Sequence, residues 1–417
     1  LKQVRIYCHL IPSPCEIWYW SESTDTLWFQ YSCHPVAALQ KLIPPLQIIM
    51  ALSAEHAQTL SERVLPLLTQ REDLVVGKVS SCRNIAKLWA GMGAVFDVKI
   101  DMRSTSEKKE GFVSFIVKVV QLPASCESVG DLRKKNSYLV EAKFYEHHVK
   151  RVLDFGLGCP TPLCVQQSLP GVGDMVICMT KLEGSRLRSP APKVALNTAL
   201  RWLARFHALH WGEKRANDAV AAGLQPQGGF WYLDTRLEEL EKMPTEGWEG
   251  RLRNAAKALD FRLKSDKFQT ICHGDAKLAN MLFANDCCKV YFYDFQYAGK
   301  ASAAKDVAYL LLGYADDEIN ELLLSYYSAL KSELQELVTG EVLPSFQSLQ
   351  ESHKLAVCDI ARWLSGWGWI GLKEVLQPTC ESVLRRLDDD IDLKSEDAYC
   401  QSMVLNFPTS SASLEAE

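Results

Sequence analysis

The chain has 417 residues, and its 46 lysines and arginines against 51 aspartates and glutamates give a formal net charge of −5. Hydrophobic residues make up 47% and charged residues 23%, which excludes a chain that is disordered throughout. The slight acidic excess argues against a general nucleic-acid-binding protein, and no run of about 18 apolar residues indicates a membrane span. We expect a soluble, cytoplasmic protein of two or three structural units, without nucleic-acid or membrane partners.

The cysteines favour the same compartment. All 14 are scattered along the chain, with no C-x-x-C pair and a single adjacent doublet, Cys287 and Cys288. This distribution matches neither a zinc site nor a disulfide framework. We therefore expect the protein to work in a reducing environment.

Residues 1–49 differ from the rest of the chain. The sequence begins at Leu1, its first methionine is Met50, and the segment between is rich in aromatic residues without a steady helical or strand period. From Ser53 onward, regular helical spacing of apolar residues begins. We expect residues 1–49 to be a non-globular extension or a segment wrongly included in a gene model. The alternative is a genuine extension of a chain that lost its start.

The next part of the chain, residues 50–182, has the pattern of a small sheet with one helix. Residues 94–101 alternate apolar and mostly polar side chains, and 112–120 form a nearly continuous apolar run, so the two predict an antiparallel hairpin. A helix is expected to open at residue 136 or 137 and to run to about 148, and a buried strand is expected at 175–180. The order strand, strand, helix, strand predicts an α+β lobe.

Helical patterns dominate after Gly184. Apolar residues recur there at three- and four-residue spacing. The expected helices span residues 194–210, 237–243, 252–263, 306–337 and 349–363. One strand-like island, 281–283 and 290–293, interrupts them and is joined by a turn. We expect a larger helical lobe over 183–404 and a disordered tail over 405–417.

The segment from Cys272 to Asn280, with the sequence CHGDAKLAN, carries the most chemical information, together with Asp294 after the next hairpin. Phosphoryl transfer from ATP needs a carboxylate that accepts the proton of the attacking hydroxyl, and ligands that hold Mg²⁺ on the phosphates. An aspartate with an asparagine five residues later and a second aspartate after a hairpin has the spacing of kinase catalytic loops. We predict Asp275 as the base, and Asn280 and Asp294 as Mg²⁺ ligands.

These residues resemble the kinase-like phosphotransferases of small molecules, which comprise aminoglycoside phosphotransferases, choline kinases and ecdysteroid-kinase-like proteins. His273-Gly274-Asp275 is similar to that family's motif rather than to the His-Arg-Asp of protein kinases. Asp294-Phe295-Gln296 is closest to the ecdysteroid-kinase-like branch. The likeness extends over about residues 75–370. It implies a bilobal, protein-kinase-like fold of the α+β class.

Two residues of the N-terminal half fit the nucleotide site of such a kinase. Lys118 lies among apolar residues of the expected strand, and a buried lysine is rare unless its ammonium meets an anion. The kinase pattern places this lysine on the ATP phosphates with a helix glutamate as partner. Glu141, between Tyr138 and Tyr145 on one helix face, fits that role. The alternatives are an edge-strand lysine that reaches solvent and an exposed helix carboxylate.

Three further assignments complete the nucleotide site. Lys277 is expected to neutralise charge on the transferring phosphate, the alternative being a lysine that faces solvent. Gly91 and Gly93 are expected in the phosphate-contacting loop, although they do not form a full G-x-G-x-x-G motif. The segment from Met179 to Leu182 is expected to contact adenine, on its order along the chain alone.

Asp306 and the helix that carries Arg205, His207 and His210 are expected to have structural roles. The family resemblance implies that Asp306 braces the backbone of the catalytic loop, and its place at a helix start also suits a cap. The other three residues are assigned to packing.

Two aromatic clusters occupy the helical half, where the resemblance places the acceptor. They are Phe230-Trp231-Tyr232 and the group Trp363, Trp367 and Trp369. Their faces can hold a quaternary ammonium or stack on a sterol-like skeleton, but filling the core is the favoured interpretation. The sequence does not select one acceptor.

The leading hypothesis is an ATP- and Mg²⁺-dependent phosphotransferase that acts on a hydroxyl of a small molecule. A catalytically silent ATP-binding module is the alternative, disfavoured because every expected catalytic position is present. A protein kinase is less favoured, because Gly274 replaces the arginine and no Ala-Pro-Glu segment follows Asp294. The sequence gives no indication of the oligomeric state.

Overall fold

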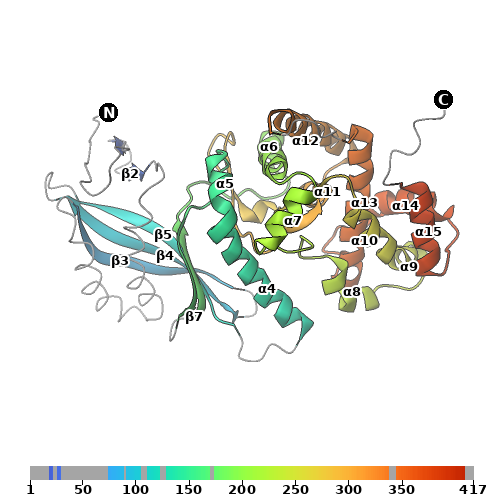
Figure 1. Cartoon of the computed structure of the whole chain (residues 1–417), viewed down its shortest axis with the longest axis horizontal. Helices are drawn as coiled ribbons and strands as arrows, with labels where there is room; N and C mark the ends of the chain where they lie inside the picture. The colour runs from blue at the N-terminus through green and yellow to red at the C-terminus, as the bar shows by residue number, and fades with distance from the viewer. Residues whose placement is uncertain are drawn as a thin grey trace. The chain divides into compact units, whose positions relative to one another are not determined.

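The structure, a computed structural model, describes residues 18–21, 26–29, 74–88, 91–104, 110–122, 128–169, 173–337 and 344–408. The chain divides into two compact units (Figure 1). The sheet unit lies within Leu1–Cys126 and Pro160–Lys181, and the helical unit within Glu127–Cys159 and Leu182–Glu417. The helix expected from Ser53 lies outside the described residues, as does most of segment 1–49.

A five-stranded antiparallel sheet forms the sheet unit, in the order β3-β4-β5-β7-β6. The strands are β3 Leu74–Lys87, β4 Gly93–Ser104, β5 Glu110–Val120, β6 Pro162–Leu169 and β7 Gly173–Thr180. The predicted hairpin is β4-β5, and the third predicted strand is β7. The central strand β5 is buried at Val117, Val119 and Val120, β-branched residues that favour a strand between two others.

A separate two-stranded hairpin lies within the first 49 residues. Its strands, β1 Trp18–Ser21 and β2 Thr26–Phe29, pair antiparallel. The sequence showed no strand period there. The expectation that residues 1–49 are an extension or an artefact stays a prediction.

Helix α4, Val129–Lys143, begins earlier than expected because Ser128 caps it and accepts the backbone N–H of Asp131. It continues as the π-helical turn η2, Phe144–His148, and as α5, Val149–Asp154. The sequence predicts this helix in the N-terminal lobe, whereas it belongs to the helical unit. The physical reason is that the end of this helix packs on the segment that follows Asp294. The ring of Phe144 stacks on Phe295 with centroids 3.8 Å apart.

The helical unit contains the long helices expected from the sequence, with several breaks and additions (Figure 1). They are α6 Lys193–Leu209, α7 Glu213–Ala221, α8 Leu237–Glu241, α9 Gly247–Asn254, α10 Ala256–Lys264, α11 Ala304–Leu310, α12 Asp316–Leu337, α13 Phe346–Trp367, α14 Lys373–Asp388 and α15 Glu396–Asn406. The single helix expected over 306–337 is wrong. Gly313, with φ +88°, separates α11 from α12. Because α15 ends at Asn406, helical structure reaches two residues into the expected tail.

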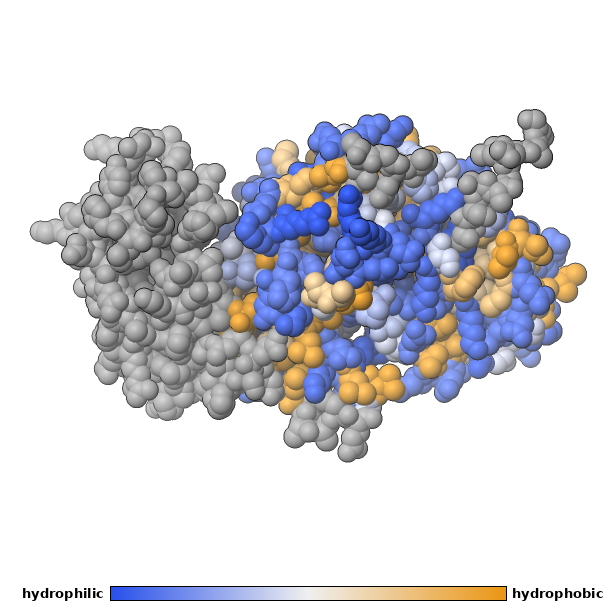
Figure 2. Space-filling view, in the orientation of Figure 1, coloured by the Kyte–Doolittle hydropathy of each residue, from blue (hydrophilic) through white to orange (hydrophobic). Residues whose placement is uncertain are grey.

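Two short antiparallel strand pairs frame the catalytic segment. β8 Gln269–Cys272 pairs with β11 Gly299–Ser302, and β9 Met281–Phe283 pairs with β10 Val290–Phe292, as predicted for the strand-like island. Among the described residues, no helix has the length and apolar character that a membrane crossing requires. On the face drawn in Figure 2, apolar residues of the helical unit form separate spots among hydrophilic ones.

The antiparallel sheet and the helical part that follows it confirm the predicted α+β fold.

Candidate active site

The catalytic segment folds into a tight loop between β8 and β9, and it brings three predicted site residues together. The short 3₁₀ turn η4, Leu278–Asn280, directs the Asn280 side chain back to Asp275. The Asn280 Nδ2 group donates to the Asp275 main-chain oxygen at 3.0 Å and to Asp275 Oδ2 at 2.8 Å. Lys277 Nζ lies 2.9 Å from the same Oδ2. Lys277 therefore pairs with the predicted base.

Asp275 has the environment of a proton acceptor. Its side chain is buried, and its Oδ1 has no hydrogen-bond partner within the described part of the chain. Burial raises the pKa of Asp275 to about 6, a rise that Lys277 opposes and the charge of Asp294 assists. One oxygen is thus held by Asn280 and Lys277, while the other, also buried, has no hydrogen-bond partner among the described residues.

Asp294 lies directly after the β9-β10 hairpin in a left-handed backbone conformation, with φ +69°. Few non-glycine residues adopt this conformation, and its presence at a predicted metal ligand is typical of functional strain. Since the Asn280 amide nitrogen is engaged with Asp275, its oxygen is the atom left for a cation. Asn280 Oδ1 and the Asp294 carboxylate are hard oxygen donors of the kind that Mg²⁺ prefers, so the residues fit this metal.

The backbone of the loop is held by Asp306 of α11. Its carboxylate accepts the backbone N–H of His273 at 2.6 Å and of Gly274 at 2.9 Å. The predicted bracing role is confirmed, and the role is structural as expected, but Asp306 is not a helix cap, since α11 has no side-chain cap. Burial alone would raise the pKa of Asp306, but hydrogen bonds from His207 and the Gly274 N–H hold it below its ordinary value.

Two buried histidines complete this support. His207 Nε2 lies 3.1 Å from Asp306 Oδ2, and its Nδ1 lies 2.7 Å from the Tyr326 hydroxyl. In His273, Nδ1 accepts the Asp275 N–H at 3.3 Å and Nε2 faces the Tyr293 carbonyl at 3.1 Å. The two partners of His273 require a neutral ring with the proton on Nε2. Burial lowers the pKa of His273, which favours this neutral form.

Gly274 explains why this loop departs from the protein-kinase motif. Its φ is +79°, and a Cβ atom at this position would lie 2.0 Å from the main-chain oxygen of Tyr297. An arginine therefore cannot occupy the position without moving the chain. The glycine permits the close approach of the segment that follows Asp294.

Residues 295 and 296 connect the predicted metal ligand to helix α4. Phe295 is fully buried and stacks on Phe144, and the Ser137 hydroxyl donates to Gln296 Oε1 at 3.3 Å. Glu141 of α4 is only 2% exposed, so the alternative of an exposed carboxylate is wrong. Burial, followed by the charges of Glu141 and Asp294, raises the pKa of Tyr145 well above its ordinary range, so Tyr145 lies near both acids.

A family model described as the phosphotransferase enzyme family matches residues 114–337, which is more than half of the chain. The chain belongs to this family. The match begins in β5 and ends with α12, so it includes Lys118 and the whole catalytic segment. The predicted membership of the kinase-like small-molecule phosphotransferases is confirmed, while the closeness to the ecdysteroid-kinase-like branch stays a prediction.

Solved structures of phosphotransferases resemble this family member. Choline kinase LicA from Streptococcus pneumoniae is 14% identical, with a TM-score of 0.43, over 79% of this chain and 100% of its own. Macrolide 2'-phosphotransferase MphH from Brachybacterium faecium is 15% identical, with a TM-score of 0.42, over 76% of this chain and 98% of its own. No curated protein sequence matches the chain. The family assignment rests on the sequence match alone.

In the sheet unit, Lys118 lies on the central strand. It pairs with Val95 of β4 and Ile177 of β7, and its side chain is only 6% exposed. The alternative of an edge-strand lysine is therefore wrong. The pairing of Lys118 with Glu141 and its contact with ATP stay predictions.

The other nucleotide-site candidates of the family member lie at the ends of strands. Gly91 belongs to the turn between β3 and β4, and Gly93 is the first residue of β4, where a Cβ atom would lie 2.0 Å from the Val119 oxygen. Packing of the sheet is thus one reason for this glycine. Met179 is buried within β7, between β5 and β6, and the strand ends one residue later. The contact of the segment from Met179 to Leu182 with adenine stays a prediction.

The predicted aromatic clusters separate into core and surface residues. Trp231 is fully buried and Trp363 is 6% exposed, whereas Trp367 stacks on Trp363 and is 51% exposed. Trp369 belongs to a different group with Trp248, whose ring centroid lies 5.6 Å away. Filling of the core is confirmed for Trp231. Aromatic residues from other elements also contact Phe230, and the sequence did not predict these contacts.

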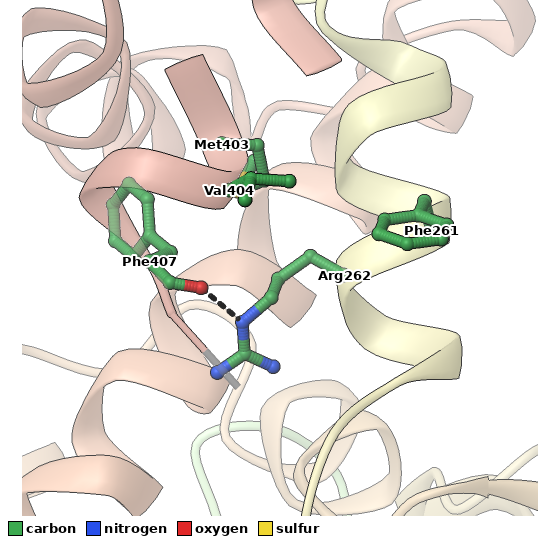
Figure 3. Close-up of a pocket in the computed structure, with 5 residues that line it drawn as sticks. All are labelled: Phe261, Arg262, Met403, Val404 and Phe407. Atoms are coloured by element: carbon green, nitrogen blue, oxygen red, sulfur yellow. Dashed lines mark hydrogen bonds between the residues drawn. The ribbon is translucent and has the colours of Figure 1, made fainter. Parts of the chain in front are cut away.

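A small hollow between α10 and α15 lies apart from the catalytic segment. Figure 3 shows its lining, in which the Arg262 guanidinium donates to the Phe407 carbonyl at 2.8 Å. None of the five residues that line it belongs to the loop of Asp275 or to the segment of Asp294. We do not assign the acceptor to this hollow.

Proposed function

We propose that the protein transfers the γ-phosphate of ATP to a hydroxyl of a small-molecule acceptor, with Mg²⁺ as cofactor. One observation carries the proposal. Asp275 is buried with one oxygen held by Asn280 and Lys277 and with the other lacking a partner among the described residues. This is the arrangement that a proton acceptor for an attacking hydroxyl requires.

The chain's residues divide the reaction between them. The acceptor hydroxyl gives its proton to Oδ1 of Asp275 as its oxygen bonds to the γ-phosphorus. The bond from that phosphorus to the bridging oxygen breaks, and ADP leaves with the electron pair. Lys277 offsets the charge on the transferring group, and Lys118 and Glu141 position the nucleotide. Asn280 and Asp294 would hold Mg²⁺, which neutralises phosphate charge when bound.

The direct test is an assay of the full chain with labelled ATP, Mg²⁺ and a metabolite extract, followed by mass spectrometry of labelled products. We expect a phosphorylated small molecule with the wild type and with Asp317→Asn, which removes an exposed carboxylate of α12. We expect none with Asp275→Asn. Mg²⁺-dependent ATP binding without any labelled product would contradict the proposal and support a silent binding module.

A further inference from the structure

The ring of Phe230 lies between two cations beside the predicted base. Lys277 Nζ is 5.8 Å from the ring centroid, and the Arg236 guanidinium carbon is 5.7 Å from it. Arg236 also lies 5.6 Å from the centroid of Trp363, which meets Phe230 edge-on at 4.9 Å. Since Lys277 contacts Asp275, the aromatic wall of Phe230 and Trp363 extends from the proton acceptor to the buried Arg236.

A second arginine adjoins the first. Arg133 of α4 donates from Nη1 to the Thr235 carbonyl at 2.6 Å, next to Arg236 in the chain. Burial and then the charge of Arg133 lower the pKa of Arg236, so the two cations repel each other. Glu239 pairs with Arg236 at 3.0 Å, but Arg133 has no ion-pair partner within the described ranges. An anion between the two guanidinium groups would relieve this repulsion.

The pKa of Tyr297 responds to the charges of both the catalytic acids and the two arginines. Burial raises the pKa of Tyr297, the charges of Asp275 and Asp294 raise it further, and those of Arg133 and Arg236 lower it. Its ring centroid is 5.6 Å from that of Phe230. Because Lys277, which contacts Asp275, and Arg236 both lie within 5.8 Å of the Phe230 ring centroid, one small molecule can present a hydroxyl to Asp275 and another group to Arg236.

The hydrogen-bonding capacity of the wall also favours an anion. The indole N–H of Trp363, a residue 6% exposed, has no partner in the described part of the chain, and a buried donor of this kind is normally hydrogen-bonded. The rings of Phe230 and Trp363 already face the protein's own cations, Lys277 and Arg236. A quaternary ammonium would compete with these charges for the same ring faces.

From this arrangement we infer that the acceptor carries an acidic group, a carboxylate, sulfate or phosphate, that Arg133 and Arg236 bind while the aromatic wall packs on its apolar body. The inference rests on the proposed function, and it separates this protein from kinases of cationic acceptors. The acidic group is recognised through charge-assisted hydrogen bonds, which are stronger than neutral ones.

Three probes with one hydroxyphenyl body test the charge preference without requiring catalysis. They are 4-hydroxyphenylacetate, the neutral alcohol tyrosol and the ammonium compound tyramine, with Kd measured by ligand-observed NMR on the full chain. We expect the carboxylate to bind about tenfold more tightly than tyrosol, and tyramine to bind most weakly. Equal affinities, or tighter binding of tyramine, would overturn the inference.

Substitutions test whether the two arginines cause the preference for the carboxylate probe. Arg133→Gln, which alters a partly exposed residue, is expected to remove most of the advantage of 4-hydroxyphenylacetate over tyrosol. Arg236→Lys keeps the charge of a buried residue and should reduce the advantage by loss of the guanidinium fork. Lys214→Gln, an exposed lysine of α7, is the matched control and should keep it. An unchanged preference in Arg133→Gln and Arg236→Lys alike would refute the assignment.

Failure of the proposed function is distinguishable from failure of this inference. Asp275→Asn should lose phosphoryl transfer but keep the order of probe affinities, because the arginines are untouched. In the transfer assay, the extract is first separated by ion exchange. We expect the labelled product to derive from the fraction retained on an anion exchanger, whereas a product from the cation-exchanger fraction would overturn the inference.

Discussion

Asp275 and Lys277 form a pair in which each residue sets the behaviour of the other. The base must be ionised to accept a proton, and burial raises its pKa to about 6 against the opposing effect of Lys277. We therefore expect kcat/KM to fall as the pH drops below about 6. Lys277→Ala should move this fall to higher pH, because the ammonium that lowers the pKa is lost. It should also reduce kcat roughly a hundredfold while ATP binding changes little.

The measurement is a pH profile of kcat/KM for the wild type and Lys277→Ala. An acidic limb at the same pH in both proteins would show that Lys277 does not act on the base. An unaltered kcat would reject its role at the transferring phosphate.

Asp294 combines a charge with an unusual backbone conformation, and substitutions can separate the two. Asparagine tolerates positive φ values, so Asp294→Asn should keep the fold while losing the predicted metal ligand. We expect a fall in kcat of at least about a hundredfold that added Mg²⁺ recovers only in part. The matched control is Asp389→Asn, an exposed residue at the end of α14 that also has positive φ, +48°.

Activity is followed against Mg²⁺ concentration, with thermal unfolding as the measure of fold. Full activity in Asp294→Asn would exclude this residue as a ligand. A loss of activity in Asp389→Asn of the same size would show that the effect is not specific to Asp294 and would not support a ligand role.

At the scale of elements, α11 holds the catalytic loop through one carboxylate. Asp306 accepts from two loop N–H groups and from His207. An asparagine has one oxygen for these three donors, so Asp306→Asn should cost about 2–4 kcal/mol of unfolding free energy and lower kcat. Tyr326→Phe, which removes only the partner of His207, should cost about 1 kcal/mol. Denaturant unfolding compares the two, and equal costs would contradict the proposed brace.

The elements that the sequence predicted are those with a buried face. β4, β5 and β7 lie inside the sheet, so apolar residues mark them clearly. β3 and β6 are the edge strands, and residues 81–87 of β3 are all exposed, which leaves no alternation to detect. The break between α11 and α12 was missed because the apolar period continues across Gly313.

At the scale of the whole molecule, the parts of the candidate site were predicted unequally. Asp275, Lys277 and Asn280 belong to one short loop, so their spacing alone predicts their meeting. Arg133 and Arg236 come from α4 and from the segment before α8, and no local pattern joins them. The two arginines become neighbours only when the chain folds. The aromatic residues were predicted to fill the core, because a sequence does not show which face of a ring is free to contact a ligand.

The stability of the helical unit should depend on pH through two buried histidines. Burial lowers the pKa of His210 to about 3 and that of His353, in the long helix α13, to about 4. The pKa of an unfolded histidine is near 6.5, so below this pH the unfolded chain binds protons that these two histidines do not bind in the folded chain. Stability is therefore fully present above about pH 6.5 and is lost as the pH falls toward 4. For His353 the loss amounts to about 3 kcal/mol.

His353→Leu removes this proton uptake from the unfolded chain, and it also removes an Nε2 atom that has no partner among the described residues. Relative to the wild type, the variant should gain unfolding free energy as the pH falls from 7.5 to 4.5. Urea unfolding of the full chain at both pH values measures the difference. His147→Leu is the matched control, because its imidazole is exposed on η2. A difference between His353→Leu and wild type that is the same at both pH values would mean that His353 is protonated in the folded unit, and that its buried site contains a partner for the charge.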